Sequence, residues 1–220
     1  ELKAAFEEES GLEVTYVAPG EGGSLVNQLI LTKDAPLGDV VYGIDNLLSG
    51  RALAEGVVQD FTAIDFGDVC INADLVWFEE HDLALPVTLD DLTDPAYEDL
   101  LVVTNPASSS PGLAFLAATV GAKGEDGYLD YWQALADNGL RVVQGWSEAY
   151  YTDFSGADGK GPRPLVLSYA TSPAVTLTED GSASTTVALP ETCFRQTEYA
   201  GVITGAQNPE GAAEFIDFLL

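Results

Sequence analysis

Short apolar runs that end in polar residues recur along the chain, and helical patterns separate them. We expect buried strands at residues 38–45 (GDVVYGID), 100–106 (LLVVTNP) and 164–173 (PLVLSYATSP). Helical spacing follows or precedes them at residues 24–31, 108–121 and 210–220. This alternation predicts a layered α/β fold with parallel strands, because parallel strands need a crossover helix to return the chain. Ligands of such sheets bind outside the carboxyl ends of the strands.

Two extended segments, 61–78 and 192–204, flank the middle of the chain. We expect the chain to leave one lobe, build a second and return, so that extended strands cross a hinge. The predicted lobes are 1–66 with 195–220, and 67–194. Outside this pattern, residues 12–19 alternate like a half-buried strand, and the composition of 155–164 predicts a surface loop.

The charge balance is strongly acidic. Eight Lys and Arg face 36 Asp and Glu, for a formal charge of -28. Such a surface repels nucleic acid and anionic membranes and attracts cations. Dispersed acids also fit a whole-surface adaptation to solubility or high salt. No apolar stretch reaches the roughly 18 residues of a spanning helix, and we expect a soluble chain with further elements before Glu1 and after Leu220.

The two cysteines, Cys70 and Cys193, permit one intramolecular pairing. In an oxidising compartment, a bridge would close a loop that the chain-entropy model values at about 4 to 5 kcal/mol. Two buried free thiols are nearly as compatible with the sequence. Because neither cysteine lies in a C-x-x-C motif or near His81, a zinc or redox site is not expected.

Aromatic residues follow two of the predicted strands. In GWSEAYY, Trp146 stands at a strand end and Tyr150 lies one helical turn further on, so the two rings are candidates for the walls of an aromatic slot. In SYATSP, Tyr169 and Ser172 add a ring and a hydroxyl. Aromatic walls bind flat heterocycles and cations at roughly 0.5 to 2 kcal/mol per contact. All of these residues could instead be core or turn residues.

Hydroxyl and carboxylate groups lie at other strand ends. A run of serines begins the helix after residues 100–106, where free backbone N–H groups and hydroxyls form a candidate anion site or an ordinary cap: Ser108, Ser109 and Ser110. Asp45 and Asp65 follow apolar runs and are candidates to accept hydrogen bonds from an amino-pyrimidine or to neutralise a cation. Either could also be a cap or turn residue.

A serine hydrolase is the enzymatic alternative. The sequence around Ser147 approximates the G-x-S-x-G elbow of α/β-hydrolases but lacks the second glycine. The sole histidine, His81, precedes Ser147, whereas that fold orders its triad serine, acid, histidine. The serine therefore lacks a general base, and we expect no catalysis, no cofactor and no metal site.

Together the motifs resemble the thiamine-binding members of the periplasmic solute-binding proteins that serve ABC importers. The resemblance is carried most specifically by GWSEAY and LSYATSP, and more widely by VTNPASSSPG and the last helix. It implies a two-lobe, type II periplasmic-binding-protein fold with the ligand clamped in an interlobe cleft. It also implies an extracytoplasmic monomer that delivers thiamine or a thiamine phosphate to a membrane permease.

The resemblance also implies ligand contacts. It carries over to Trp146, Tyr150, Tyr169 and Ser172, with Asp45 and Ser147 as weaker candidates. Within the same fold, the sequence leaves open another small solute, such as a carboxylate, a polyamine or ferric iron. The only tyrosine after Tyr169 is Tyr199, and this lack of a tyrosine pair argues against iron.

Overall fold

The computed structural model describes residues 1–18, 20–158 and 160–220, which form two compact units. The first unit is Glu1–Phe66 with Thr197–Leu220, and the second is Gly67–Gln196. The chain passes from the first to the second within β2 (Thr62–Asp74) and returns within β7 (Phe194–Val202).

Among the described residues, the first unit contains β1 (Val40–Asp45), parts of β2 and β7, and four helices. β1 runs antiparallel to β7, with an irregularity between Tyr42 and Ile44 where Gly43 has a φ of 91°. The prediction of a parallel strand at residues 38–45 is therefore wrong. The strand that pairs with β1 is β7, which comes from near the end of the chain and runs in the opposite direction. The helices are α1 (Leu2–Ser10), α2 (Gly22–Leu31), α3 (Ser49–Ala54) and α7 (Pro209–Phe218).

The strand predicted at residues 12–19 is wrong over the part that the structure describes. Residues 12–18 have no regular secondary structure, and Tyr16 and Val17 are exposed. Alternation alone could not supply a partner strand, and a strand is stable only when its backbone groups are paired. Pro19, at the end of that prediction, and Gly159, in the predicted loop 155–164, lie outside the described residues.

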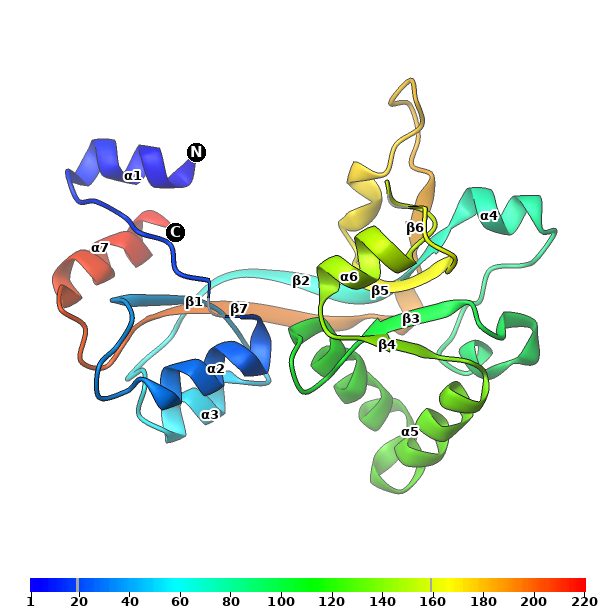
Figure 1. Ribbon diagram of the computed structural model, residues 1–220, viewed down its shortest axis with the longest axis horizontal. Coiled ribbons are helices and arrows are strands. Elements are labelled where there is room, and N and C mark those ends of the chain that lie inside the picture. Colours follow the sequence, from blue (N-terminus) through cyan, green and yellow to red (C-terminus); the bar gives the residue numbers. More distant parts are fainter. Residues whose placement is uncertain (19, 159) are drawn as a thin grey trace. The chain divides into compact units, whose positions relative to one another are not determined.

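The second unit contains a mixed sheet with the strand order β2-β5-β3-β4. β3 (Leu101–Thr104) is parallel to both β4 (Arg141–Val143) and β5 (Leu165–Tyr169), as the α/β pattern predicts. β2 runs antiparallel to β5 and to β6 (Thr186–Ala188). Figure 1 shows α5 (Ser110–Asp137) on one side of these strands and α6 (Trp146–Glu148) on the other.

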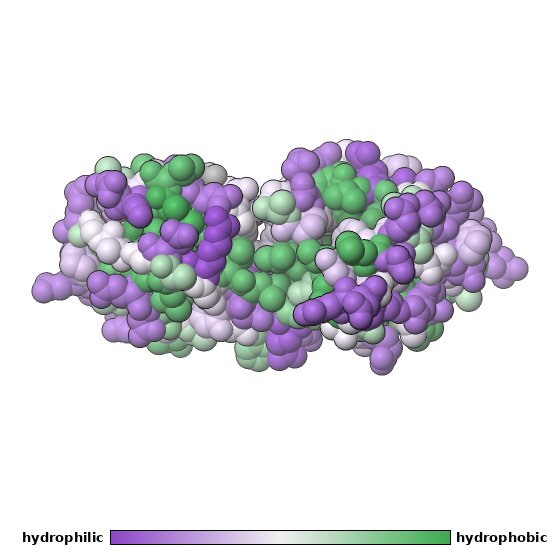
Figure 2. All heavy atoms as spheres, turned by 90° about the horizontal axis from the view of Figure 1, so that it is seen from below, coloured by the Kyte–Doolittle hydropathy of each residue, from purple (hydrophilic) through white to green (hydrophobic). Residues whose placement is uncertain are grey.

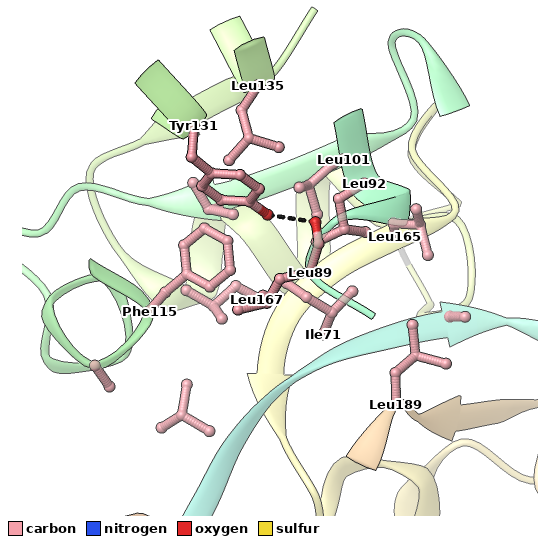
Figure 3. Packing of buried hydrophobic residues seen from close by; sticks show 14 of the residues in the cluster. Ile71, Leu89, Leu92, Leu101, Phe115, Tyr131, Leu135, Leu165, Leu167 and Leu189 are labelled. Carbon is pink, nitrogen blue, oxygen red and sulfur yellow. Dashed lines mark hydrogen bonds between the residues drawn. The ribbon is translucent and has the colours of Figure 1, made fainter. Parts of the chain in front are cut away.

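Side chains on the α5 side form a mainly apolar core, which we call the packed face. Alternate residues of β3 and β5 enter it, and Phe115 and Tyr131 come from α5. The Tyr131 hydroxyl donates to the backbone oxygen of Leu89 at 2.7 Å, as Figure 3 shows. Each fully buried large side chain stabilises the fold by roughly 1.5 to 3 kcal/mol. The labelled members in Figure 3 also include Ile71, Leu92, Leu101, Leu135, Leu165, Leu167 and Leu189.

The other side of the same strands, which we call the aromatic face, has a different composition. Val102, Val143 and Val166 meet Tyr150 and Phe154 there, and Trp146 packs against this cluster. Because side chains alternate along a strand, the next positions on this side are hydroxyl-bearing: Thr104 on β3 and Ser168 on β5. Both are fully buried.

The remaining helices of the second unit are short, apart from α5. α5 is broken at Gly124, whose φ of 74° is outside the helical range, so two helical segments cover the packed face.

Among the described residues, no helix has the length and apolarity needed to cross a membrane. Seen from below in Figure 2, the surface is mostly hydrophilic with separate hydrophobic patches. The short elements are α4 (Leu75–Glu80), η1 (Asp91–Thr93), η2 (Pro95–Tyr97), η3 (Ala149–Asp153), η4 (Ser172–Val175) and η5 (Pro190–Thr192).

Candidate functional site

The indole ring of Trp146 is fixed at the carboxyl end of β4. Gly145, in extended conformation, precedes α6, and Trp146 is the first residue of that helix. Its Nε1–H donates to Ser168 Oγ at 2.9 Å. The Ser168 and Ser172 hydroxyl oxygens are 2.7 Å apart, and the backbone N–H of Tyr169 donates to Ser172 Oγ at 3.3 Å. The structure thus brings GWSEAYY and SYATSP together through hydrogen bonds.

Three tyrosines surround Trp146, and we call the four residues the aromatic cluster. Tyr150 stacks on the indole with ring centroids 4.8 Å apart and an interplanar angle of 18°. Tyr151 meets it edge-on at 5.4 Å, and Tyr169 lies 6.4 Å away at 51°. Trp146 and Tyr169 are half-buried, whereas Tyr151 is 51% exposed. Sequence reasoning did not select Tyr151, although its position beside Tyr150 was a signal.

Tyr150 has a different place from the one expected. The slot predicted between Trp146 and Tyr150 is not open, because the two rings stack directly on each other. Tyr150 is 2% exposed and also packs against Phe154 at 5.5 Å. Burial raises the pKa of its hydroxyl, with smaller opposite effects from Ser172 and Thr176. In this structure Tyr150 supports one face of the indole, and Trp146, Tyr151 and Tyr169 are the more exposed members of the cluster.

The serine run begins α5 next to the end of β3. Ser108 Oγ donates to the backbone oxygen of Gln144 at 2.8 Å, which ties this turn to the residue after β4. Ser109 and Ser110 are buried. Ser109 Oγ and Thr104 Oγ1 have no hydrogen-bond partner among the described residues. Buried hydroxyls are normally paired, so two without a partner beside a helix start are suited to a polar ligand group.

The helix start approaches β3 so closely that one position requires glycine. A Cβ at Gly112 would lie 2.4 Å from the Thr104 backbone oxygen, closer than atoms can approach. The absence of a side chain therefore lets the first turn of α5 rest on the strand end, which brings the serines to the carboxyl edge of the sheet.

Asp45 and Asp65 belong to the first unit. Asp45 is 1% exposed, and its Oδ1 accepts hydrogen bonds from Leu47 and Leu48. Its Oδ2 has no partner among the described residues. Asp65 is exposed and accepts from the Tyr42 hydroxyl at 2.5 Å. Burial and this hydrogen bond raise the pKa of Tyr42. Asp45 thus acts as a turn cap with one spare oxygen.

Ser147 and His81 have separate local environments. Ser147 is exposed in α6. The His81 ring stacks on Trp77 with centroids 3.8 Å apart, and its Nδ1 lies 2.8 Å from the Trp77 backbone oxygen. His81 is therefore engaged with the residue one turn earlier on its own helix, as expected of a surface residue.

Cys70 and Cys193 form a disulfide, which decides between the two alternatives that the sequence left open. Cys70 lies opposite Ser168 in the β2–β5 pairing. Alternation with Ile71 places its side chain on the aromatic face. The bridge therefore ties β2 to the chain after η5 beside the strand that carries Ser168 and Tyr169.

Comparisons with known proteins identify the kind of protein to which this arrangement belongs. The family model "Bacterial extracellular solute-binding protein" matches residues 45–220. The thiamine-binding periplasmic protein of Brucella melitensis biotype 1 is 31% identical, over 99% of this chain and 68% of its own. The protein of the same name from Escherichia coli (strain K12) is also 31% identical, over 100% of this chain and 70% of its own.

A solved structure agrees with these relatives. The structure of a periplasmic thiamin binding protein aligns with a TM-score of 0.87 and 29% identity, over 99% of this chain and 71% of its own. The periplasmic binding protein AfuA from Actinobacillus pleuropneumoniae aligns with a TM-score of 0.82 at 20% identity and shares the fold. The α/β fold of two-lobe periplasmic binding proteins, predicted from the sequence, is confirmed.

The resemblance noted from the motifs is thereby confirmed, and the protein is a binding protein for a small molecule rather than an enzyme. Its place of action is extracytoplasmic, in keeping with its relatives. With a family model that matches most of the chain and relatives that align over nearly all of it, this chain belongs to the family of bacterial extracellular solute-binding proteins.

Proposed function

We propose that this protein captures thiamine or a thiamine phosphate and delivers it to the permease of an ABC importer. The observation that carries the proposal is the preorganised Trp146 indole. One ring face rests on Tyr150, and its Nε1–H is held by Ser168. Tyr169 and Tyr151 flank it. A ring fixed before the ligand arrives loses little freedom on binding, which raises affinity.

Thiamine suits this arrangement because it joins a flat, positively charged thiazolium ring to an aminopyrimidine. Aromatic faces attract such a ring by stacking and through the ring quadrupole, at roughly 0.5 to 2 kcal/mol per contact. The excess of 28 negative charges attracts cationic ligands. Ser147 and Ser172 are the proposed hydroxyl contacts beside the rings. The names of the relatives support this ligand class.

The start of α5 supports a phosphate-bearing form of the ligand. Thr104 and Ser109 offer buried hydroxyls without a partner among the described residues, and Ser108 and Ser110 adjoin them. Free N–H groups at a helix N-terminus bind phosphate without an arginine. In the first unit, Asp45 and Asp65 remain the proposed acceptors for a cationic ligand. We also propose that the two compact units are the functional lobes and that the protein is a monomer.

The test is calorimetry on the full-length protein with thiamine, thiamine monophosphate and thiamine diphosphate. We expect tight binding of at least one form. The double substitution Trp146→Ala, Tyr169→Ala should weaken it about 5- to 1,000-fold, the sum of two aromatic contacts. Trp77→Ala is the matched control, since Trp77 stacks on His81 instead. No heat with any of the three compounds would refute the proposed ligand.

Another small solute remains the alternative within the same fold, with carboxylates, polyamines and ferric iron as the classes considered. Native mass spectrometry of the protein purified from its own host should show a copurified mass that matches a thiamine form. A polyamine, carboxylate or iron adduct at the same stoichiometry would replace thiamine in the proposal and keep the fold and family.

A further inference from the structure

One arginine holds the segment that carries Trp146. Arg141, at the start of β4, has its Nε 2.8 Å from Oδ1 of Asp153, the last residue of η3. A terminal nitrogen of Arg141 lies 3.9 Å from Oε1 of Glu148, the last residue of α6. Glu148 also accepts the backbone N–H of Gln144 at 3.3 Å. A single guanidinium thus links the strand to two carboxylates on either side of Tyr150.

The two carboxylates that Arg141 contacts, which we call the two arms of the Arg141 clamp, differ in burial. Asp153 is 6% exposed, and its second oxygen has no partner among the described residues. Its hydrogen bond to Arg141 raises the pKa of the guanidinium. The Glu148 side chain is 46% exposed, so this arm is weakened by solvent. The Asp153 arm therefore dominates, because a buried carboxylate depends on its partner more than an exposed one does.

The segment between these carboxylates is a single turn, whose end is also held by the backbone N–H of Arg163, which donates to the Asp153 backbone oxygen at 2.9 Å. η3 is a π-helical turn, in which Phe154 N–H donates to the Ala149 oxygen five residues earlier at 3.0 Å. Such turns are rare and are frequently found at functional sites. Tyr150, on which the indole rests, lies within this turn. A shift of the turn would therefore move the surface that supports Trp146.

We propose that Arg141 is a positioning residue, which orients Trp146 for the ligand by fixing η3 through Asp153 and α6 through Glu148. The identity of the ligand rests on the function proposed above, whereas the orientation of the indole is a property of the free protein. The two parts can therefore fail separately.

The ligand-free test uses the three tryptophan indole N–H resonances in NMR spectra, with Trp146→Phe to assign the relevant one. In Arg141→Gln, we expect the Trp146 resonance to shift and its proton to exchange with water about tenfold faster, because the segment opens more often. The Trp77 and Trp132 resonances should stay in place. Lys123→Gln is the matched control, since it removes the ion pair between Lys123 of α5 and Asp90, the residue before η1.

The binding arm compares thiamine affinity in the same proteins. Arg141→Gln should weaken binding about tenfold, and Asp153→Asn should add little to it, because residues that act through one another are not additive. If Arg141→Gln does not fold, Arg141→Lys takes its place in both measurements, since it keeps the charge beside Asp153 but loses the guanidinium that contacts both carboxylates. An unchanged Trp146 resonance in the folded variant overturns the proposal. Absence of thiamine binding in the unsubstituted protein refutes the ligand and leaves the NMR result to decide the positioning.

Discussion

The packed face and the aromatic face of the second unit each hold a tryptophan in nearly the same way. Trp132 Nε1–H donates to Thr119 Oγ1 at 2.9 Å, and Trp146 Nε1–H donates to Ser168 Oγ at 2.9 Å. The surroundings differ. Trp132 packs edge-on against Phe115 in a large apolar core, whereas Trp146 lies among tyrosines and its N–H donates to a buried serine hydroxyl. The same kind of hydrogen bond therefore holds a tryptophan in a core on one side of the sheet and orients a half-buried tryptophan on the other side.

The difference in composition between the two faces indicates that each contributes differently to stability and to the proposed binding. The packed face consists mainly of apolar side chains, and the Tyr131 hydroxyl and the Trp132 N–H each have a hydrogen-bond acceptor, so its burial is favourable. The aromatic face retains hydroxyls without partners among the described residues, an arrangement that costs stability. Substitutions should therefore separate the two faces by what they change.

The largest effect should come from the disulfide, which joins Cys70 of β2 to Cys193, near the last residue of the second unit in sequence. Replacing both cysteines by serine releases a loop with a sequence separation of 123 and should cost about 5 kcal/mol of unfolding free energy in the chain-entropy model. Urea unfolding of the oxidised protein and the variant measures this. A loss below about 1 kcal/mol would mean that the unfolded chain is already constrained in other ways.

On the packed face, Phe115→Ala should cost about 4 kcal/mol, because it leaves a cavity in a fully buried core. Trp146→Ala on the aromatic face should cost less stability, since that ring is half-buried, yet should remove most of the ligand affinity. Urea unfolding and calorimetry on both variants test the contrast. Equal losses of affinity in folded samples of both variants would break the distinction between the faces.

The two indole hydrogen bonds allow a closer comparison. Ser168→Ala and Thr119→Val each remove the acceptor of one indole N–H, and each should cost about 1 to 2 kcal/mol of stability. Only Ser168→Ala should also weaken thiamine binding, because it frees the ring that is proposed to contact the ligand. A matching loss of affinity in Thr119→Val would show that binding follows overall stability and not the orientation of Trp146.

The smallest effect concerns an exposed turn outside both faces. Asp180 accepts hydrogen bonds from Thr178 and Ser182, which lower its pKa from 3.8 to about 2. Because the pKa is lowered, the ionised Asp180 carboxylate stabilises the turn fully above about pH 4. This stabilisation is lost as the pH falls through about 2 and the carboxylate is protonated. The Ser182 amide resonance should report this midpoint. Asp180→Asn should abolish the titration, and a midpoint near pH 4 would contradict the hydrogen bonds.

Much of the fold follows from local pattern. β3 and β5 each begin with three consecutive apolar residues, a pattern that favours buried strands. Pro111 and the serines before it marked the start of α5. The strand predicted at 12–19 failed over its described part because alternation says nothing of a partner, and β1 lay antiparallel to a strand more than a hundred residues away.

In the candidate site, too, some features followed from the sequence and others only from the tertiary structure. The sequence by itself determined which residue types stand at the strand ends, since Trp146, Tyr169 and Ser108 each follow an apolar run. Only the tertiary structure decided that Tyr150 supports the indole, that Ser168 holds it and that Arg141 reaches Asp153. The physical reason is that these contacts join separate strands and turns, and their distances depend on how the whole sheet packs rather than on spacing along the chain.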